Sequence, residues 1–168
     1  MRTRDLKAWG DQLGCSGQRD PAIVDPIWQA VRASDPVASN WGPTDPQTGA
    51  PSGLLRPPTI DAWGWNRRTA PSVTVPALFL SGLLDTTAPT QTAINQYTAI
   101  GSSTKVLIKI ACASHNMLWE SSASANWQGG PHATLRDAVV EWITSETYQG
   151  KSKGTFQVDA NGNITGPF

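Results

Sequence analysis

The sequence contains an aspartate and a histidine whose side chains could share a proton. Asp85 lies in SGLLDTTAP and His115 lies in ACASHNM. A carboxylate that accepts the Nδ1 proton of an imidazole fixes its tautomer and stabilises the imidazolium that forms when Nε2 takes a proton. This is the chemistry of a general base with an orienting acid. We therefore treat Asp85 and His115 as candidate catalytic residues.

Each residue also has an ordinary interpretation. An aspartate before Thr-Thr-Ala-Pro is typical of a turn or a helix cap, and a single loop histidine is more often non-catalytic. Their joint placement favours the functional interpretation. Asp85 follows one predicted strand and His115 follows the next, and functional groups collect at the carboxyl ends of strands in open α/β sheets.

The surrounding sequence predicts alternating strands and helices. Apolar runs over 73–81 and 105–111 are typical of parallel strands that are covered on both faces. Helices are expected over 90–100 and 132–146, and residues 155–166 are expected to form a β-hairpin. This alternation predicts an α/β fold with a parallel sheet and crossover helices.

Local signals suggest where some elements begin, turn and bury a face. Asp25 and Pro26 fit the cap and first residue of a further helix over 25–34. Asn161 and Gly162 fit a type I′ turn in the hairpin. The apolar positions of the last helix recur at the spacing of one helical face: Leu135, Ala138, Val139, Trp142 and Ile143.

The two parts of the chain differ in character. Residues 1–70 are rich in Trp and Pro and are expected to form an irregular, cap-like segment, whereas residues 71–168 carry the α/β pattern. Trp41, Trp63 and Trp65 either line an apolar substrate pocket or only pin a Pro-rich loop. Of the three, Trp63 and Trp65 are the better pocket candidates because they lie closest to the first strand.

Three segments resemble the α/β-hydrolase superfamily. VPALFLSGLLDTTAP resembles the strand and loop that deliver the acid, KVLIKIACASHNMLWE resembles the next strand and the histidine loop, and HATLRDAVVEWI resembles the terminal helix. The resemblance covers roughly residues 70–148. It implies a partial α/β-hydrolase fold in a serine hydrolase of carboxylic esters or amides. It also implies that Asp85 is the acid and that His115 is the general base.

The nucleophile that this family requires is missing from the pattern. No G-x-S-x-G elbow is present, and the nearest approach is GCSGQ around Ser16, which ends in Gln and follows no apolar strand. A turn serine is therefore the favoured interpretation of Ser16, with a nucleophile as the weaker one. We expect the chain to represent the C-terminal portion of such an enzyme, or one half of a split enzyme.

Two other functions stay open. An upstream Asp nucleophile in the same fold would give epoxide or haloalkane hydrolysis. A non-catalytic domain could instead bind an apolar or carbohydrate ligand through its tryptophans. Geometry separates this last alternative from the enzymes, since the enzyme hypothesis loses its main support if Asp85 lies beyond hydrogen-bond reach of His115.

The composition and the motifs of the chain limit the kinds of partner that we expect. Lys and Arg total 13, as do Asp and Glu, so the net charge of zero does not indicate a nucleic-acid partner. No apolar run reaches the ~18 residues of a membrane span, and MRTRDLKAWG lacks the apolar region of a signal peptide. No cofactor motif or complete metal-ligand set is present, so we expect a small-molecule substrate and no cofactor. Cys15 and Cys112 fit either one disulfide or two thiols, so the compartment stays open.

The strands raise one further expectation. A sheet made only of 73–81 and 105–111 would have unpaired, apolar edges, which promote aggregation. We therefore expect the chain to need a partner, such as a missing N-terminal half, or to self-associate.

Overall fold

The computed structural model describes residues 10, 13–34 and 68–166. Within these ranges no helix is long and apolar enough to cross a membrane. The three tryptophans that the sequence offers as pocket candidates lie outside the described residues, so their role stays a prediction: Trp41, Trp63 and Trp65.

The chain divides into two compact units. One combines Met1–Asp11 with Pro21–Asp61, and the other combines Gln12–Asp20 with Ala62–Phe168. The second unit carries the sheet and both candidate catalytic residues. Part of the predicted cap-like segment, Gln12–Asp20, thus groups with the sheet.

The first unit contains helix α2, Pro21–Ser34. The helix begins at Pro21 and not at Asp25, so Pro26 lies inside it. Pro21 explains the earlier start, because its fixed φ suits the first helical position and its missing N–H is not needed there. An amide of Gln29 donates to Asp25 Oδ1 at 3.3 Å, one turn away along the helix.

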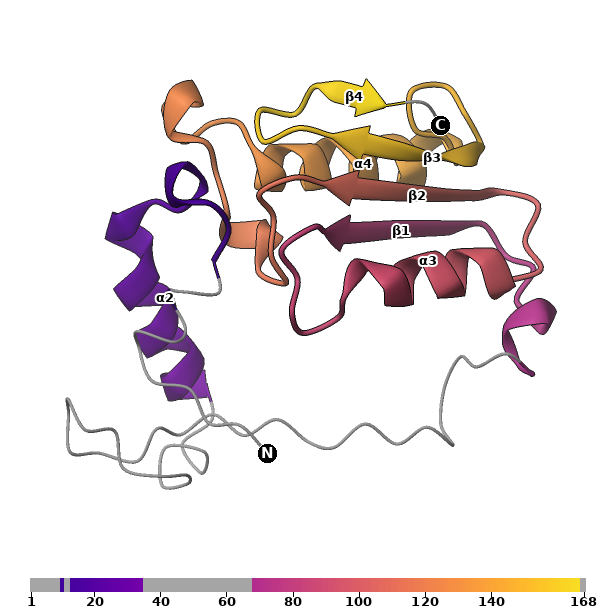
Figure 1. Ribbon diagram of the computed structural model, residues 1–168, viewed down its shortest axis with the longest axis horizontal. Helices are drawn as coiled ribbons and strands as arrows, with labels where there is room; N and C mark the ends of the chain where they lie inside the picture. The colour runs from indigo at the N-terminus through magenta and orange to yellow at the C-terminus, as the bar shows by residue number, and fades with distance from the viewer. Residues whose placement is uncertain (1–9, 11–12, 35–67, 167–168) are drawn as a thin grey trace. The chain divides into compact units, whose positions relative to one another are not determined.

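The second unit is built on a four-stranded open sheet in the order β1-β2-β3-β4 (Figure 1). The strands are β1 (Ala77–Gly82), β2 (Lys105–Ile110), β3 (Lys153–Val158) and β4 (Ile164–Gly166). The first three strands are parallel, and β4 runs antiparallel to β3. This mostly parallel sheet with helices confirms the predicted α/β class.

Two longer helices pack on the sheet, and this unit also contains several short 3-10 helices. These elements are α3 (Thr90–Ala99), α4 (Pro131–Ser145), η1 (Ser16–Gln18), η3 (Ala70–Ser72), η4 (Met117–Trp119) and η5 (Ala123–Ala125). Phe79 faces α3, where its ring meets Tyr97 edge-on at 6.1 Å between centroids. Leu78 and Leu80 pack instead with the cluster that contains Ala138 of α4. Because neighbouring side chains of a strand point to opposite faces, α3 and α4 cover opposite faces of the sheet.

The main core lies between β2, β3 and α4. Val106, Ile108, Ile110 and Ala138 are fully buried there, and Phe156 is nearly so. Leu107, on the other face of β2, is buried as well. Burial on both faces is the physical reason for the near-continuous apolar run that marks this strand in the sequence.

The strands differ from expectation in two respects. β1 begins at Ala77 and not at Val73, because Pro76 lacks the N–H that a paired strand would use, and Val75 is exposed. The expected two-stranded sheet is also wrong, since β3 pairs in parallel with β2. The outer edge of β2 is therefore covered.

The turn between β3 and β4 is organised by Asp159. Its Oδ1 accepts hydrogen bonds from the backbone N–H groups of Asn161 (2.8 Å) and Asn163 (2.9 Å). Gly162 has a φ of +94°, whereas Asn161 is not in the positive-φ region. A type I′ turn needs positive φ at both central residues, so that expectation is wrong. The aspartate side chain stabilises a different, wider turn.

Helix α4 confirms most of its predicted apolar face, with one exception. Ala138 is fully buried, and Leu135 and Trp142 pack against the main core. Ile143 is instead 77% exposed. At 3.6 residues per turn, Ile143 is rotated away from the stripe formed by Ala138 and Trp142, so it faces away from the sheet.

Candidate active site

The loops that follow β1 and β2 are tied together at one edge of the sheet. Gly82 and Ile110 are paired in the parallel ladder, so both strands end at the same level. The backbone N–H of Leu83 donates to Ile110 O, and that of Leu84 donates to Ala113 O, each at 2.9 Å. The two loops therefore leave the sheet side by side.

Gly82 permits this close approach. A Cβ at this position would lie 2.3 Å from the carbonyl oxygen of Ala113 and 2.7 Å from that of Ser114. Both are backbone atoms that cannot swing aside. Only glycine lets the two loops come this close.

The two loops bring Asp85 and His115 together. His115 Nδ1 lies 2.9 Å from Asp85 Oδ2. The other carboxylate oxygen, Oδ1, accepts the backbone N–H groups of Thr87 (2.8 Å) and Ala88 (2.7 Å). The side chain of Asp85 is 6% exposed and that of His115 is 54% exposed. A buried, fixed carboxylate thus faces a ring that is open to solvent.

This geometry sets the tautomer of His115. An ionised carboxylate can only accept hydrogen bonds, so Nδ1 of the neutral ring carries the proton and Nε2 presents a lone pair. Within the described part of the chain, Nε2 has no hydrogen bond. The arrangement is capable of taking a proton at Nε2, which is what a general base does.

A disulfide settles the state of the two cysteines. Cys15 is bonded to Cys112, which lies 97 positions later in the sequence. The backbone N–H of Cys15 also donates to Cys112 O at 3.4 Å. The disulfide fastens the segment around Cys15 to the loop that carries His115.

Ser16 follows Cys15 in the short helix η1 and is exposed. Among the described residues no hydrogen bond joins Ser16 to His115, and no strand precedes η1. A nucleophile elbow sits between a strand and a helix. The surroundings of Ser16 therefore lack the framework of such an elbow.

Sequence analysis did not identify Glu120 as part of this region. Its carboxylate is fully buried and accepts the backbone N–H groups of Gly14 and Ser114, each at 2.8 Å. The hydroxyl of Ser114 donates to the same carboxylate. The only signal was an acid at the end of the apolar run MLWE, which also fits a surface position.

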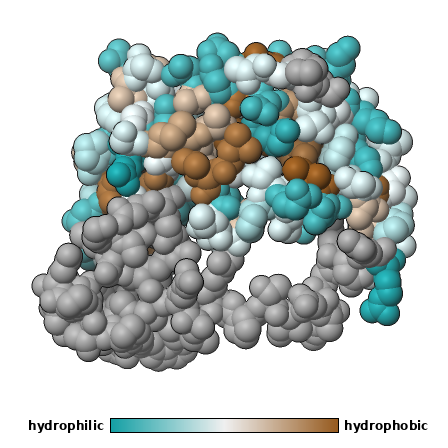
Figure 2. Space-filling model, viewed as in Figure 1, coloured by the Kyte–Doolittle hydropathy of each residue, from teal (hydrophilic) through white to brown (hydrophobic). Residues whose placement is uncertain are grey.

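Exposed leucines lie close to Asp85 and His115 in the sequence. Leu83 and Leu84 directly precede Asp85 and are 41% and 47% exposed, and Leu118, three positions after His115, is 60% exposed. Figure 2 shows hydrophobic residues gathered on the face that carries β1 and the loops after it. These leucines are therefore exposed apolar side chains that lie close to the pair in the sequence.

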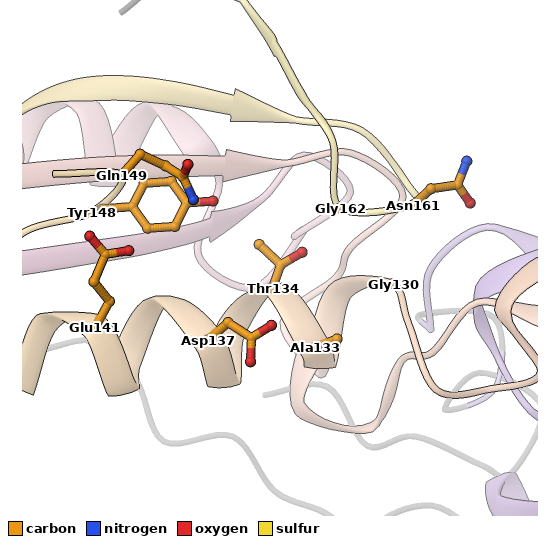
Figure 3. A pocket seen from close by; sticks show the side chains of 9 residues that line it. All are labelled: Gly130, Ala133, Thr134, Asp137, Glu141, Tyr148, Gln149, Asn161 and Gly162. Carbon is orange, nitrogen blue, oxygen red and sulfur yellow. The ribbon is translucent and has the colours of Figure 1, made fainter. Parts of the chain in front are cut away.

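A separate cavity of about 210 Å³ lies between α4 and the turn after β3 (Figure 3). It is lined by Gly130, Ala133, Thr134, Asp137, Glu141, Tyr148, Gln149, Asn161 and Gly162. Glu141 already accepts hydrogen bonds from the hydroxyl of Thr147 (2.9 Å) and the N–H of Gly150 (3.1 Å). The cavity includes neither Asp85 nor His115, so it is not part of the candidate active site.

Burial, hydrogen bonds and neighbouring charges shift the pKa of two groups that line this cavity. Burial raises the pKa of the Glu141 carboxyl, but hydrogen bonds from Gly150, Gln149 and Thr147 outweigh burial and leave the pKa below its ordinary value. Burial, followed by the charges of Glu141 and Asp137, raises the pKa of Tyr148. The phenol therefore stays protonated to a higher pH than usual.

No group of three or more His, Cys, Asp or Glu side chains within the described ranges could hold a metal ion. Comparison with protein-family models, curated proteins and solved structures gives no match. Any function therefore has to be inferred from the residues of this chain and their geometry.

Proposed function

We propose that this chain supplies the acid and base of an α/β-hydrolase-type serine hydrolase, as the C-terminal portion of that enzyme. The observation that supports the proposal is the 2.9 Å contact between His115 Nδ1 and Asp85 Oδ2 at the carboxyl ends of adjacent parallel strands. The substrates are carboxylic esters or amides. The serine nucleophile lies outside the residues that the structure describes.

In this proposal Asp85 orients and His115 transfers the proton. His115 Nε2 takes the proton of the serine hydroxyl as the serine oxygen attacks the carbonyl carbon, and Asp85 stabilises the imidazolium. The imidazolium then gives its proton to the leaving alcohol or amine, which leaves an acyl-enzyme. A water molecule then attacks the acyl-enzyme, with His115 again taking and returning the proton. This step releases the carboxylic acid product and the free serine. General base catalysis of this kind contributes about 10²–10⁴-fold to the rate.

The exposed leucines favour a particular kind of substrate. Leu84 directly precedes Asp85, and Leu118 lies three residues after His115, in η4. An apolar group next to the scissile bond would cover these side chains and gain free energy from the area removed from water. We therefore favour esters with an apolar acyl or alcohol group.

Labelling with a fluorophosphonate tests the proposal, because this reagent phosphonylates only a serine that a base has activated. The full-length native protein is labelled, and the modified peptide is identified by mass spectrometry. We expect His115→Ala to abolish labelling. His132→Gln changes the other of the two histidines and is expected to keep it.

Each other outcome has a defined meaning. Labelling that survives in His115→Ala contradicts His115 as the base. An unlabelled wild-type protein contradicts a serine nucleophile and favours the Asp nucleophile of an epoxide or haloalkane hydrolase. A label on Ser16 would show that the nucleophile lies within this chain.

A further inference from the structure

We propose that Glu120 is a positioning residue for His115. Its buried carboxylate fixes the backbone on both sides of the histidine, so that the exposed ring keeps Nδ1 directed at Asp85. The inference rests on the proposed function, because it concerns the geometry of the same Asp–His pair. It adds a third side chain, and a segment distant in sequence, to the site.

The contacts of Glu120 are those of an ionised carboxylate. Oε1 accepts the N–H of Gly14 and the hydroxyl of Ser114, and Oε2 accepts the N–H of Ser114. A carboxylate is acceptor-only with two oxygens, so it can satisfy all three donors. Hydrogen bonds to a charged acceptor are about twice as strong as neutral ones, and these are sheltered because Glu120 has no exposed surface.

These contacts reach His115 from both sides. Ser114 directly precedes the histidine, and both its N–H and its hydroxyl are held by Glu120. The Ser114 hydroxyl in turn accepts the backbone N–H of Asn116 at 3.0 Å. The residue before His115 and the residue after it are therefore connected to one buried carboxylate.

Glu120 itself is anchored to the rest of the fold. Its carbonyl oxygen accepts the N–H of His132 in the first turn of α4 at 2.8 Å, and its own N–H donates to Met117 O at 3.3 Å. The position of the carboxylate thus follows from α4. Through Gly14, the same carboxylate holds the segment that carries Cys15.

The pair needs this support because its two members are held differently. The Asp85 carboxylate is fixed by Thr87 and Ala88 and is nearly buried. The His115 ring is 54% exposed, so packing alone leaves it free to change rotamer. Its distance from Asp85 then depends on the backbone position of His115. Misplacement by about 1 Å can cost on the order of 10²-fold in rate.

The tautomer of His115 gives a direct readout. Long-range ¹H–¹⁵N correlation spectra distinguish Nδ1–H from Nε2–H in the neutral ring, and the chain has only two histidines to assign. We expect His115 of the wild-type chain to be in the Nδ1–H form. Asp85→Ala and Glu120→Gln are both expected to shift it towards the Nε2–H form. In Glu120→Gln an amide NH₂ group replaces one of the two accepting oxygens. This group would face an N–H donor and could not accept its hydrogen bond.

Two further variants separate positioning from loss of stability. Glu141→Gln removes another carboxylate that is held by a hydroxyl and a backbone N–H, but it contacts Thr147 and Gly150 and not the histidine loop. We expect it to leave the tautomer of His115 unchanged. Ser114→Ala removes only the hydroxyl that connects Glu120 to Asn116, so it tests the inference even if Glu120→Gln does not fold.

The outcomes separate this inference from the proposed function. An Nε2–H ring in the wild-type chain would contradict the Asp85–His115 pair itself, and with it the proposed function. An Nδ1–H ring that changes in Asp85→Ala but not in folded Glu120→Gln or Ser114→Ala would leave the pair intact and overturn the role of Glu120. A shift of equal size in Glu141→Gln would mean that general loosening accounts for the effect, which also overturns it.

Discussion

Cys15 and Cys112 are joined by a disulfide, and Cys112 lies three residues before His115. The bond therefore connects a segment near the start of the chain to the loop that carries the candidate base. It acts beside Glu120, which holds the neighbouring Gly14. The candidate active site is thus assembled from three stretches of chain that are far apart in sequence.

Removing the disulfide should destabilise the protein. In the chain-entropy account a bond that closes a loop of about 100 residues stabilises the folded state by ~4.7 kcal/mol, and measured losses are typically about 2–5 kcal/mol. Cys15→Ser is expected to lower the free energy of unfolding by this amount in urea titrations at 25 °C. Dithiothreitol should lower the urea midpoint of the wild-type protein and leave that of the variant unchanged. An identical midpoint for oxidised and reduced wild-type protein would refute the prediction.

Gly82→Ala should force the Asp85 and His115 loops apart. The added Cβ would lie 2.3 Å from Ala113 O, and neither backbone can move without shifting its loop. Overpacking of this kind costs about 1–3 kcal/mol, which urea unfolding would measure. The matched control is Gly17→Ala, since a Cβ at Gly17 meets no atom within 4 Å. Equal stability of the two variants would show that the loops do not need the close approach.

Tyr148 should make the protein sensitive to alkali. Burial, with the charges of Glu141 and Asp137, raises the pKa of this phenol in the folded state above its ordinary value of 10.0. Its favourable contribution is complete below pH 10 and is lost as the pH rises through the folded-state pKa, because the unfolded state releases the proton more readily.

Tyr148→Phe tests this directly, since phenylalanine has no proton to release. We expect the free energy of unfolding of the variant to decline less than that of the wild type as the pH rises above 10. A comparison at pH 8, where both side chains are neutral, gives the cost of losing the hydroxyl itself. Parallel curves for the two proteins above pH 10 would exclude Tyr148 as a source of the alkaline sensitivity.

The sequence by itself determined the fold class and the placement of the Asp–His pair. β2 was predictable because a strand covered on both faces must be apolar at nearly every position, as Val106, Leu107 and Ile108 are. The proximity of Asp85 and His115 was predictable because the carboxyl ends of parallel strands meet at one edge of a sheet. These conclusions depend on local pattern and on a general rule of sheet geometry.

Only the tertiary structure decided the contacts that depend on distant partners. The parallel pairing of β3 with β2, the Cys15–Cys112 disulfide and the buried carboxylate of Glu120 each need a partner whose identity no local pattern reveals. Glu120 shows the reason most clearly. An acid is expected at the surface unless hydrogen-bond donors surround it, and one of its donors comes from Gly14, 106 positions away. Those donors converge only once the chain has folded.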